Sequence, residues 1–289
     1  MAGMGFEYVE LSHGIRITLV PGILQALHDG IIKVSSTHNF CPLPAGMMHA
    51  APNLFEPSAP AGHGHEHEQW LRHTRRTLDF AAQVQARAVV LHLGSVRFLW
   101  LNPGRRLRHF ASYHPTAAMP ADPRYQKLLA KASARLRKRG LAFWAQTKRS
   151  VEEILPYAAE KGVRLGFENR ERFEELPGDT DFPELLSSVS RPEQAGYWHD
   201  TGHAELKERM GVTTQRRLLE ENAGRLIGFH LHDVDAGGHD HQAIGKGRVD
   251  FKMVRQFWQP HHLLVLELNS RADAAGVRES RQRIEDLLG

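Results

Sequence analysis

The stretch Trp198-His199-Asp200-Thr201-Gly202-His203-Ala204 ends a short apolar run with a carboxylate and two imidazoles. Further along the chain, Phe229-His230-Leu231-His232-Asp233 ends a second run in a similar way. Both runs have the length of a strand, which would deliver its last polar side chains into a cleft. Imidazole favours zinc, iron or copper, and carboxylate oxygen also accepts manganese and magnesium. The two stretches therefore predict a site for a divalent metal.

Four other apolar runs each end in one potential ligand. They are Ser35-Ser36-Thr37-His38, Val89-Val90-Leu91-His92, Leu165-Gly166-Phe167-Glu168 and Leu264-Val265-Leu266-Glu267. Longer segments with the periodicity of helices separate these runs. We therefore expect six strand ends to direct polar side chains toward one place.

The predicted strands are rich in valine, isoleucine and leucine. They cover residues 8–12, 33–39, 88–93, 164–169, 196–200, 227–232 and 263–268. Helices are predicted within residues 67–86, 123–138, 141–160, 181–188 and 212–223, and residues 277–288 form a last helix. Residues 41–68, which contain five prolines and a histidine-rich tract at 63–68, are predicted to be a loop. Such a tract is typical of a weak or adventitious metal site.

Alternation of strands and helices favours a parallel sheet, because parallel neighbours need a crossover connection. Polar residues at the C-terminal ends of the strands favour an α/β fold of the TIM (β/α)8 barrel type, whose chemistry lies at that face. The sequence reveals seven strands, so we expect a barrel that lacks the usual first strand. Residues 1–289 would form one domain. The strand edges near Tyr8 and Leu264 would then be open, and a homo-oligomer would be one way to cover them.

The composition is typical of a globular enzyme, with 41% hydrophobic and 24% charged residues. No apolar run reaches the roughly 18 residues of a membrane-spanning helix, and the N-terminus lacks a signal-peptide pattern. We therefore expect a cytoplasmic protein without a membrane partner. The single cysteine, Cys41, excludes an internal disulfide. It follows His38 closely, but an inert buried thiol is the favoured interpretation.

The formal net charge of +4 is modest, and much of it is local. A basic surface attracts phosphates, but for residues 126–139 a solvated helix face opposite an apolar stripe is the favoured interpretation. Residues 102–108 follow the His92 strand on the side where a barrel has its active site. The sequence contains no GxxxxGK[ST], GxGxxG or GxSxG motif, so neither a nucleotide cofactor nor a serine nucleophile is indicated.

The strand-end residues together resemble the xylose isomerase-like TIM-barrel superfamily. This superfamily contains sugar and sugar-phosphate isomerases and epimerases, and also the endonuclease IV family of AP endonucleases, which cut at abasic sites. The resemblance extends from about Tyr8 to Asn269, and it rests on the order of His38, His92, Glu168, Asp200, His203, His230, His241 and Glu267. In both branches it implies a metal quartet, formed here by Glu168, Asp200, His230 and Glu267.

In the epimerase branch, the resemblance implies that Glu168 and Glu267 bind the metal and exchange a proton with the substrate carbon beside the carbonyl. His203 matches a histidine that contacts substrate oxygens. That branch also has an arginine shortly after the His230 strand. Asp233, Val234 and Asp235 stand there in this chain, which is a departure from the family pattern.

In the endonuclease branch, the resemblance implies three clustered metals. The ligands would be His38, His92 and Glu168 for one ion, the quartet for the second, and His203, His239 and His241 for the third. Residues 200–204 and 244–247 resemble motifs of that family. However, His239 replaces an aspartate, His232 replaces an asparagine, and Asn169-Arg170-Glu171 replaces a segment of small residues. The bulky charged pair would crowd a DNA strand.

The sequence therefore predicts a divalent-metal-dependent isomerase or epimerase for a small sugar or sugar phosphate, with Glu168, Glu267 and His203 as catalytic residues. The metal would be zinc, manganese, iron or cobalt. We expect two or more ions, with Glu168 as a bridge, although His38 and His92 could equally orient substrate. An AP endonuclease acting on nucleic acid is the weaker alternative, and a catalytically inactive metal-binding barrel is a third.

Overall fold

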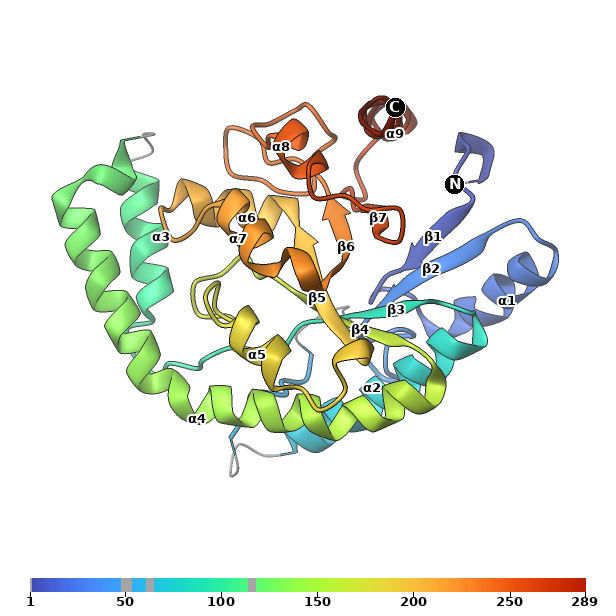
Figure 1. Cartoon of the computed structure of the whole chain (residues 1–289), viewed down its shortest axis with the longest axis horizontal. Helices are drawn as coiled ribbons and strands as arrows, with labels where there is room; N and C mark the ends of the chain where they lie inside the picture. Colours follow the sequence, from blue (N-terminus) through green and yellow to red (C-terminus); the bar gives the residue numbers. More distant parts are fainter. Residues whose placement is uncertain (1, 48–53, 61–64, 114–117) are drawn as a thin grey trace.

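The computed structural model describes residues 2–47, 54–60, 65–113 and 118–289. Seven parallel strands form one sheet in chain order: β1 (Tyr8–Leu11), β2 (Lys33–His38), β3 (Ala88–Leu91), β4 (Arg164–Glu168), β5 (Ala195–Asp200), β6 (Leu226–Leu231) and β7 (Leu263–Leu266). The sheet curls into a nearly closed barrel with helices around it (Figure 1). The predicted TIM-barrel fold with seven visible strands is confirmed.

Helices connect the strands on the outside of the barrel, as parallel crossovers require. They are α1 (Val20–His28), α2 (Glu66–Gln83), α3 (Pro103–Tyr113), α4 (Pro123–Lys161), α5 (Phe182–Ser188), α6 (Thr201–Arg209), α7 (Gln215–Asn222), α8 (Phe251–Arg255) and α9 (Ala274–Leu288). The sequence prediction omitted α1, α3, α6 and α8. The basic stretch 102–108 lies mostly in α3, whose Leu107 is fully buried against α4.

The prediction of two separate helices, 123–138 and 141–160, is wrong. Helix α4 runs without a break through Gly140, begins at an Asp122 cap that accepts a hydrogen bond from Arg124 N, and ends before Gly162 at a φ of 67°. A glycine within a helix costs about 1 kcal/mol relative to alanine. Apolar neighbours on both sides of Gly140, including Phe143, are packed and outweigh that cost.

Of the predicted loop at residues 41–68, positions 48–53 and 61–64 lie outside the described residues, and so does the start of the histidine-rich tract. His67 is already part of α2. Its Nε2 lies 3.0 Å from Oε2 of Glu153, and its Nδ1 lies 2.9 Å from Oγ of Ser150. This histidine therefore anchors α2 to α4.

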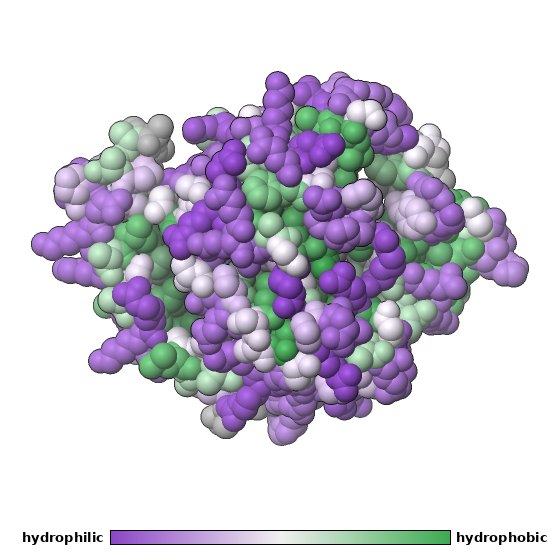
Figure 2. All heavy atoms as spheres, in the orientation of Figure 1, coloured by the Kyte–Doolittle hydropathy of each residue, from purple (hydrophilic) through white to green (hydrophobic). Residues whose placement is uncertain are grey.

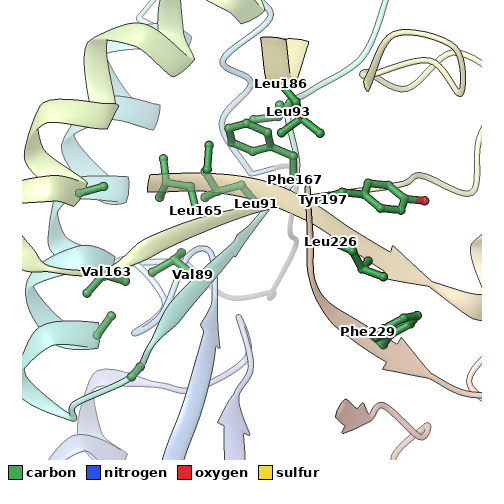
Figure 3. Close-up of a cluster of buried hydrophobic side chains, with 14 of the residues drawn as sticks. Val89, Leu91, Leu93, Val163, Leu165, Phe167, Leu186, Tyr197, Leu226 and Phe229 are labelled. Carbon is green, nitrogen blue, oxygen red and sulfur yellow. The ribbon is translucent and has the colours of Figure 1, made fainter. Parts of the chain in front are cut away.

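Alternate side chains of the strands face outward and form the main core. Val89 and Leu91 of β3, Leu165 and Phe167 of β4 and Tyr197 of β5 are all fully buried. Figure 3 shows them clustered with Leu186 of α5 and with side chains of β6. This apolar layer attaches the helices to the barrel wall and leaves the other face of each strand for the interior.

Trp198 of β5 fills the barrel interior. The glycines at Gly166 and Gly228 on the neighbouring strands make room for it, since a Cβ at Gly166 would lie 2.9 Å from the indole and one at Gly228 would lie closer still. The indole also meets the ring of His230 edge-on, with 5.2 Å between centroids. Trp198 therefore forms an apolar floor beneath the polar strand ends.

An opening remains between the first and last strands, which we call the β1–β7 opening. In the described chain β1 pairs with β2 alone and β7 with β6 alone. A groove of about 1010 Å³ lies there, lined among others by Tyr8, Glu10, Leu264 and Glu267. The opening lies where a strand preceding β1 would fit, in agreement with the prediction. A homo-oligomer stays a prediction.

Hydrophilic side chains cover most of the face seen in Figure 2, with smaller hydrophobic areas between them. None of the described helices combines the length and the hydropathy needed to cross a membrane.

Candidate metal centre

Four side chains from four neighbouring strands meet at the C-terminal end of the barrel. Glu168 and Asp200 end β4 and β5, His230 is the last residue but one of β6, and Glu267 follows β7; one ligand atom of each lies within 4.8 Å of the others. Nδ1 of His230 lies 2.6 Å from Oε1 of Glu168, 2.9 Å from Oε2 of Glu267 and 3.8 Å from Oδ2 of Asp200. Three carboxylates thus converge on one nitrogen.

The protonation of this quartet is governed by charges within it and around it. Burial would raise the pKa of Glu168, but the positive charge of Arg170, followed by the contacts with His92 and His230, holds it well below its usual value. Burial would likewise raise the pKa of Glu267, and the proximity of His230 lowers it strongly instead. For His230, burial would lower the pKa, while Glu267 and Glu10 raise it well above the ordinary value.

The residues present fit a divalent metal. Three ionised carboxylates at a largely buried position carry more negative charge than the imidazolium of His230 and the guanidinium of Arg170 balance, and buried charge is costly unless it is paired. One imidazole nitrogen with three carboxylate oxygens is a donor set suited to manganese, magnesium or zinc. An ion would displace the proton of His230 and lie among the same four groups.

Glu10, which the sequence prediction missed, supports the quartet from behind. Its Oε1 lies 2.9 Å from Nε2 of His230, and its Oε2 accepts a hydrogen bond of 2.6 Å from Oγ of Ser36. A carboxylate that holds the far nitrogen of a metal-binding histidine fixes the orientation of the ring. Glu10 lies within β1 rather than at its end, so the strand-end pattern does not reveal it. Its alternation with Tyr8 and Ser12 is the available signal.

The early histidines come together with Glu168 as expected. His38 ends β2, His92 follows β3, and the two rings lie 4.7 Å apart. Ligand atoms of His38, His92 and Glu168 form a second cluster, in which Nε2 of His92 lies 2.7 Å from Oε2 of Glu168. Arg170 also reaches this cluster: its Nη1 lies 2.7 Å from Nε2 of His92 and contacts Oε2 of Glu168.

The later histidines form clusters beside the quartet. His203, Asp240 and His241 make one, and His232, His241 and Glu267 make another. His232 lies under His241, with ring centroids 4.2 Å apart, and its Nε2 lies 3.0 Å from the carboxylate of Asp200. Through this contact His232 supports Asp200 by hydrogen bonding.

The prediction for His239 needs correction. Among the described residues, His239 belongs to none of the four clusters, and Asp240 takes the place expected for it. The side chain of His239 is 77% exposed, and its Nδ1 lies 2.9 Å from Oδ2 of Asp235. Oδ1 of Asp235 accepts a hydrogen bond from the His239 backbone. This local turn directs His239 to solvent, so the next acidic residue faces the site.

Asp233 lies in the region where the family pattern has an arginine, but its carboxylate binds backbone groups of a loop. Its Oδ2 accepts hydrogen bonds of 2.9 Å from the backbone of Gly245 and of Gly247, and its Oδ1 accepts one from Val249. The carboxylate is buried and organises the loop that returns toward the barrel. It therefore stabilises the segment that carries Asp240 and His241.

The family model of the xylose isomerase-like TIM barrel matches residues 1–287. The chain belongs to that family. No curated protein matches the sequence. Among solved xylose isomerase-like barrels and epimerases, the D-allulose 3-epimerase of Methylomonas sp. is 14% identical with a TM-score of 0.65, and the match covers 99% of this chain and 88% of that one.

Two further members of this fold are similar. For the 3-keto-D-glucoside 4-epimerase of E. coli the identity is 14%, the TM-score 0.64 and the coverage 98% of this chain and 90% of that one. A xylose isomerase-like TIM-barrel protein of Mycobacterium smegmatis, solved in complex with magnesium, is 14% identical with a TM-score of 0.57. The match covers 99% of this chain and 85% of that one. At such identities the likeness establishes the fold alone.

Proposed function

We propose that this xylose isomerase-like barrel is a divalent-metal-dependent isomerase or epimerase of a sugar or sugar phosphate. The observation that carries the proposal is the approach of two glutamates, Glu168 and Glu267, to the same nitrogen of His230 from different strands. Two carboxylates on either side of one position can remove a proton from a substrate carbon and return one. The similar folds named as epimerases support this choice.

Glu168, Asp200, His230 and Glu267 would hold the metal. Zinc, manganese, iron and cobalt are the candidates, and the magnesium in a similar barrel adds a fifth. A metal bound there supplies Lewis-acid stabilisation of the negative charge that develops on substrate oxygens.

The two glutamates differ in how far they are free to act. Glu267 is 26% exposed and is the most accessible member of the quartet. Glu168 is 1% exposed, and both of its oxygens are engaged, one by His230 and the other by Arg170 and His92. We therefore assign removal of the first proton to Glu267. Glu168 would keep its negative charge at the site and exchange the second proton.

His203 would orient the substrate. Its Nδ1 lies 3.0 Å from the carbonyl oxygen of Asn169, which leaves Nε2 for a hydroxyl or a ligand. His241, beside it, is 28% exposed. These imidazoles would bind hydroxyl oxygens of the substrate.

Deuterium exchange tests this function without knowledge of the natural sugar. The full chain, loaded with Mn²⁺ or Co²⁺, is incubated in D₂O with a panel of ketoses and ketose phosphates, and NMR follows the proton at the carbon beside the carbonyl. We expect exchange with at least one substrate and a loss of about 10²-fold or more in Glu267→Gln, the range expected for a general base. Loaded protein that exchanges no proton across the panel would reject the proposal.

An AP endonuclease is the second candidate, and the cluster of His203, Asp240 and His241 favours it, because it offers ligands for a further ion. In such an enzyme, clustered metals activate water and stabilise the leaving oxygen. Nicking of duplex DNA that contains an abasic site, at low protein concentration, distinguishes this activity from proton exchange. Metal binding without either activity would identify a non-catalytic barrel.

A further inference from the structure

A positive group of the chain itself lies at the cluster of His38, His92 and Glu168. Nη1 of Arg170 is 2.7 Å from Nε2 of His92 and also contacts Oε2 of Glu168. These are the two atoms that a metal at this cluster would need as ligands. Arg170 itself is 5% exposed, so its charge is as deeply buried as the groups it meets.

We propose that the guanidinium of Arg170 replaces a metal ion at this cluster, so that His38 and His92 line the site without binding metal. The proposal rests on the ion at the quartet that the proposed function requires, but not on the identity of the substrate. It replaces the expectation of two ions bridged by Glu168.

The guanidinium is held in place from its other side. Nη2 of Arg170 lies 3.4 Å from Oε1 of Glu175, which is also buried and whose other oxygen accepts a hydrogen bond of 2.9 Å from Arg172 N. A long side chain without such an anchor could turn away and admit an ion. Two buried carboxylates, Glu168 and Glu175, instead hold Arg170 between them.

The chemistry of the neighbours agrees with a fixed guanidinium. A guanidinium only donates hydrogen bonds and stays charged at all pH values relevant to proteins, so it pairs directly with the ionised carboxylate of Glu168. A divalent ion would have to displace a like charge from the same two atoms.

This arrangement also sets the role of Glu168. One of its oxygens serves the quartet through His230, and the other serves Arg170. The charge that a second ion would supply is thus part of the polypeptide. Water activated between two metals, as hydrolytic sites use it, would have no second metal at this position.

Metal counting tests the proposal. The full chain is stripped of metal and saturated with Mn²⁺; elemental analysis gives ions per chain, and electron paramagnetic resonance reports coupling between adjacent ions. We expect Arg170→Gln to bind one ion more than the wild type and to show a coupled pair. Arg172→Gln, which removes an exposed arginine two positions away, should match the wild type. Adding His38→Ala and His92→Ala to Arg170→Gln should remove the extra ion.

A folded Arg170→Gln protein with the wild-type count would overturn the proposal. If that variant does not fold, the double variant His38→Ala/His92→Ala in the wild-type background decides. An unchanged count supports Arg170 as the cation, and a count lower by one identifies the histidines as ligands. Deuterium exchange by the wild type is measured separately, so failure of the proposed reaction is not confused with failure of the metal count.

Discussion

Nε2 of His230 lies 2.9 Å from Oε1 of Glu10, although 220 positions separate the two residues. This side-chain contact joins β1 to β6 near the C-terminal ends of the strands. It leaves Nδ1 of His230 directed toward Glu168, Asp200 and Glu267. The orientation of the imidazole is therefore set by a strand that supplies no residue to the quartet.

Glu10→Gln should weaken metal binding. Replacing a carboxylate behind a metal-binding histidine typically reduces affinity by about 10- to 100-fold. Titration of the metal-free protein with Mn²⁺ measures the change. Glu7→Gln is the matched control, because Glu7 lies just before β1, is exposed and pairs with Lys33 at the surface. Equal affinities of the Glu10 and Glu7 variants would contradict the role assigned to Glu10.

Glu168→Gln should lose much of its metal affinity and nearly all activity while the protein stays folded. The amide keeps the shape of the side chain but removes the charge that pairs with Arg170 and His230. Circular dichroism monitors the fold, and elemental analysis with the exchange assay monitors the site. A folded variant with full metal content and turnover would end the assignment of Glu168 to the quartet.

Gly228→Ala should destabilise the barrel interior. The added methyl group would overlap the ring of Trp198, and overpacking of this kind costs about 1–3 kcal/mol. Urea unfolding gives the change in free energy. Gly224→Ala serves as control, since an added Cβ there meets no described atom within 4 Å. Equal stability of the two variants would show that the interior tolerates a larger residue.

Cys41 should not react with thiol reagents in the folded protein. Its side chain is 0% exposed, and burial raises the pKa of the thiol to about 12, so little thiolate exists at neutral pH. Titration with a chromogenic disulfide should label one thiol per chain in denaturant and essentially none without it. Rapid labelling of the native chain would place Cys41 at an accessible position and argue against the inert buried thiol.

Because of His262, the free energy of unfolding should rise with pH in the acid range. Burial, followed by repulsion from His261, lowers the pKa of His262 to about 4, against about 6.5 in the unfolded chain. Between these values the unfolded state binds more protons, so this contribution is present above pH 6.5 and is lost as pH falls toward 4.

Urea unfolding of His262→Gln across the same pH range measures that contribution. The variant should show a flatter dependence than the wild type. The control is His28→Gln, which changes an exposed histidine in α1. A His262 variant with the wild-type slope would show that other groups carry the effect.

The strands and the pool of candidate ligands were predictable because both follow from one local rule, whereas the choice of the quartet among those ligands rested on the resemblance to the family. Parallel strands bury branched apolar residues and end at a common face, so the last polar residue of each run, such as Glu168 or Asp200, marks the site. The ends of helices were harder to predict. Separate helices were predicted on either side of Gly140, but packing of the neighbouring side chains keeps α4 continuous.

The supporting residues could not be inferred from their own segments. Glu10 acts through a contact 220 positions away, and the role of Arg170 depends on His92 and Glu175, which lie on other parts of the chain. His239 and Asp240 are adjacent in sequence, and the turn formed by Asp235 decides which of them faces the site. The first two outcomes depend on tertiary packing, and the third depends on the geometry of one local turn.

A metal bound at the quartet would also have a structural role at the β1–β7 opening. Glu10 lies on β1 and Glu267 follows β7, so an ion held by the quartet would connect the two unpaired edges through side chains. Amide hydrogen exchange in residues 8–11 and 263–266 should then slow on metal loading, while the central strands change little. Closure of the cylinder, which other barrels obtain from backbone pairing, would here depend on occupancy of the metal site.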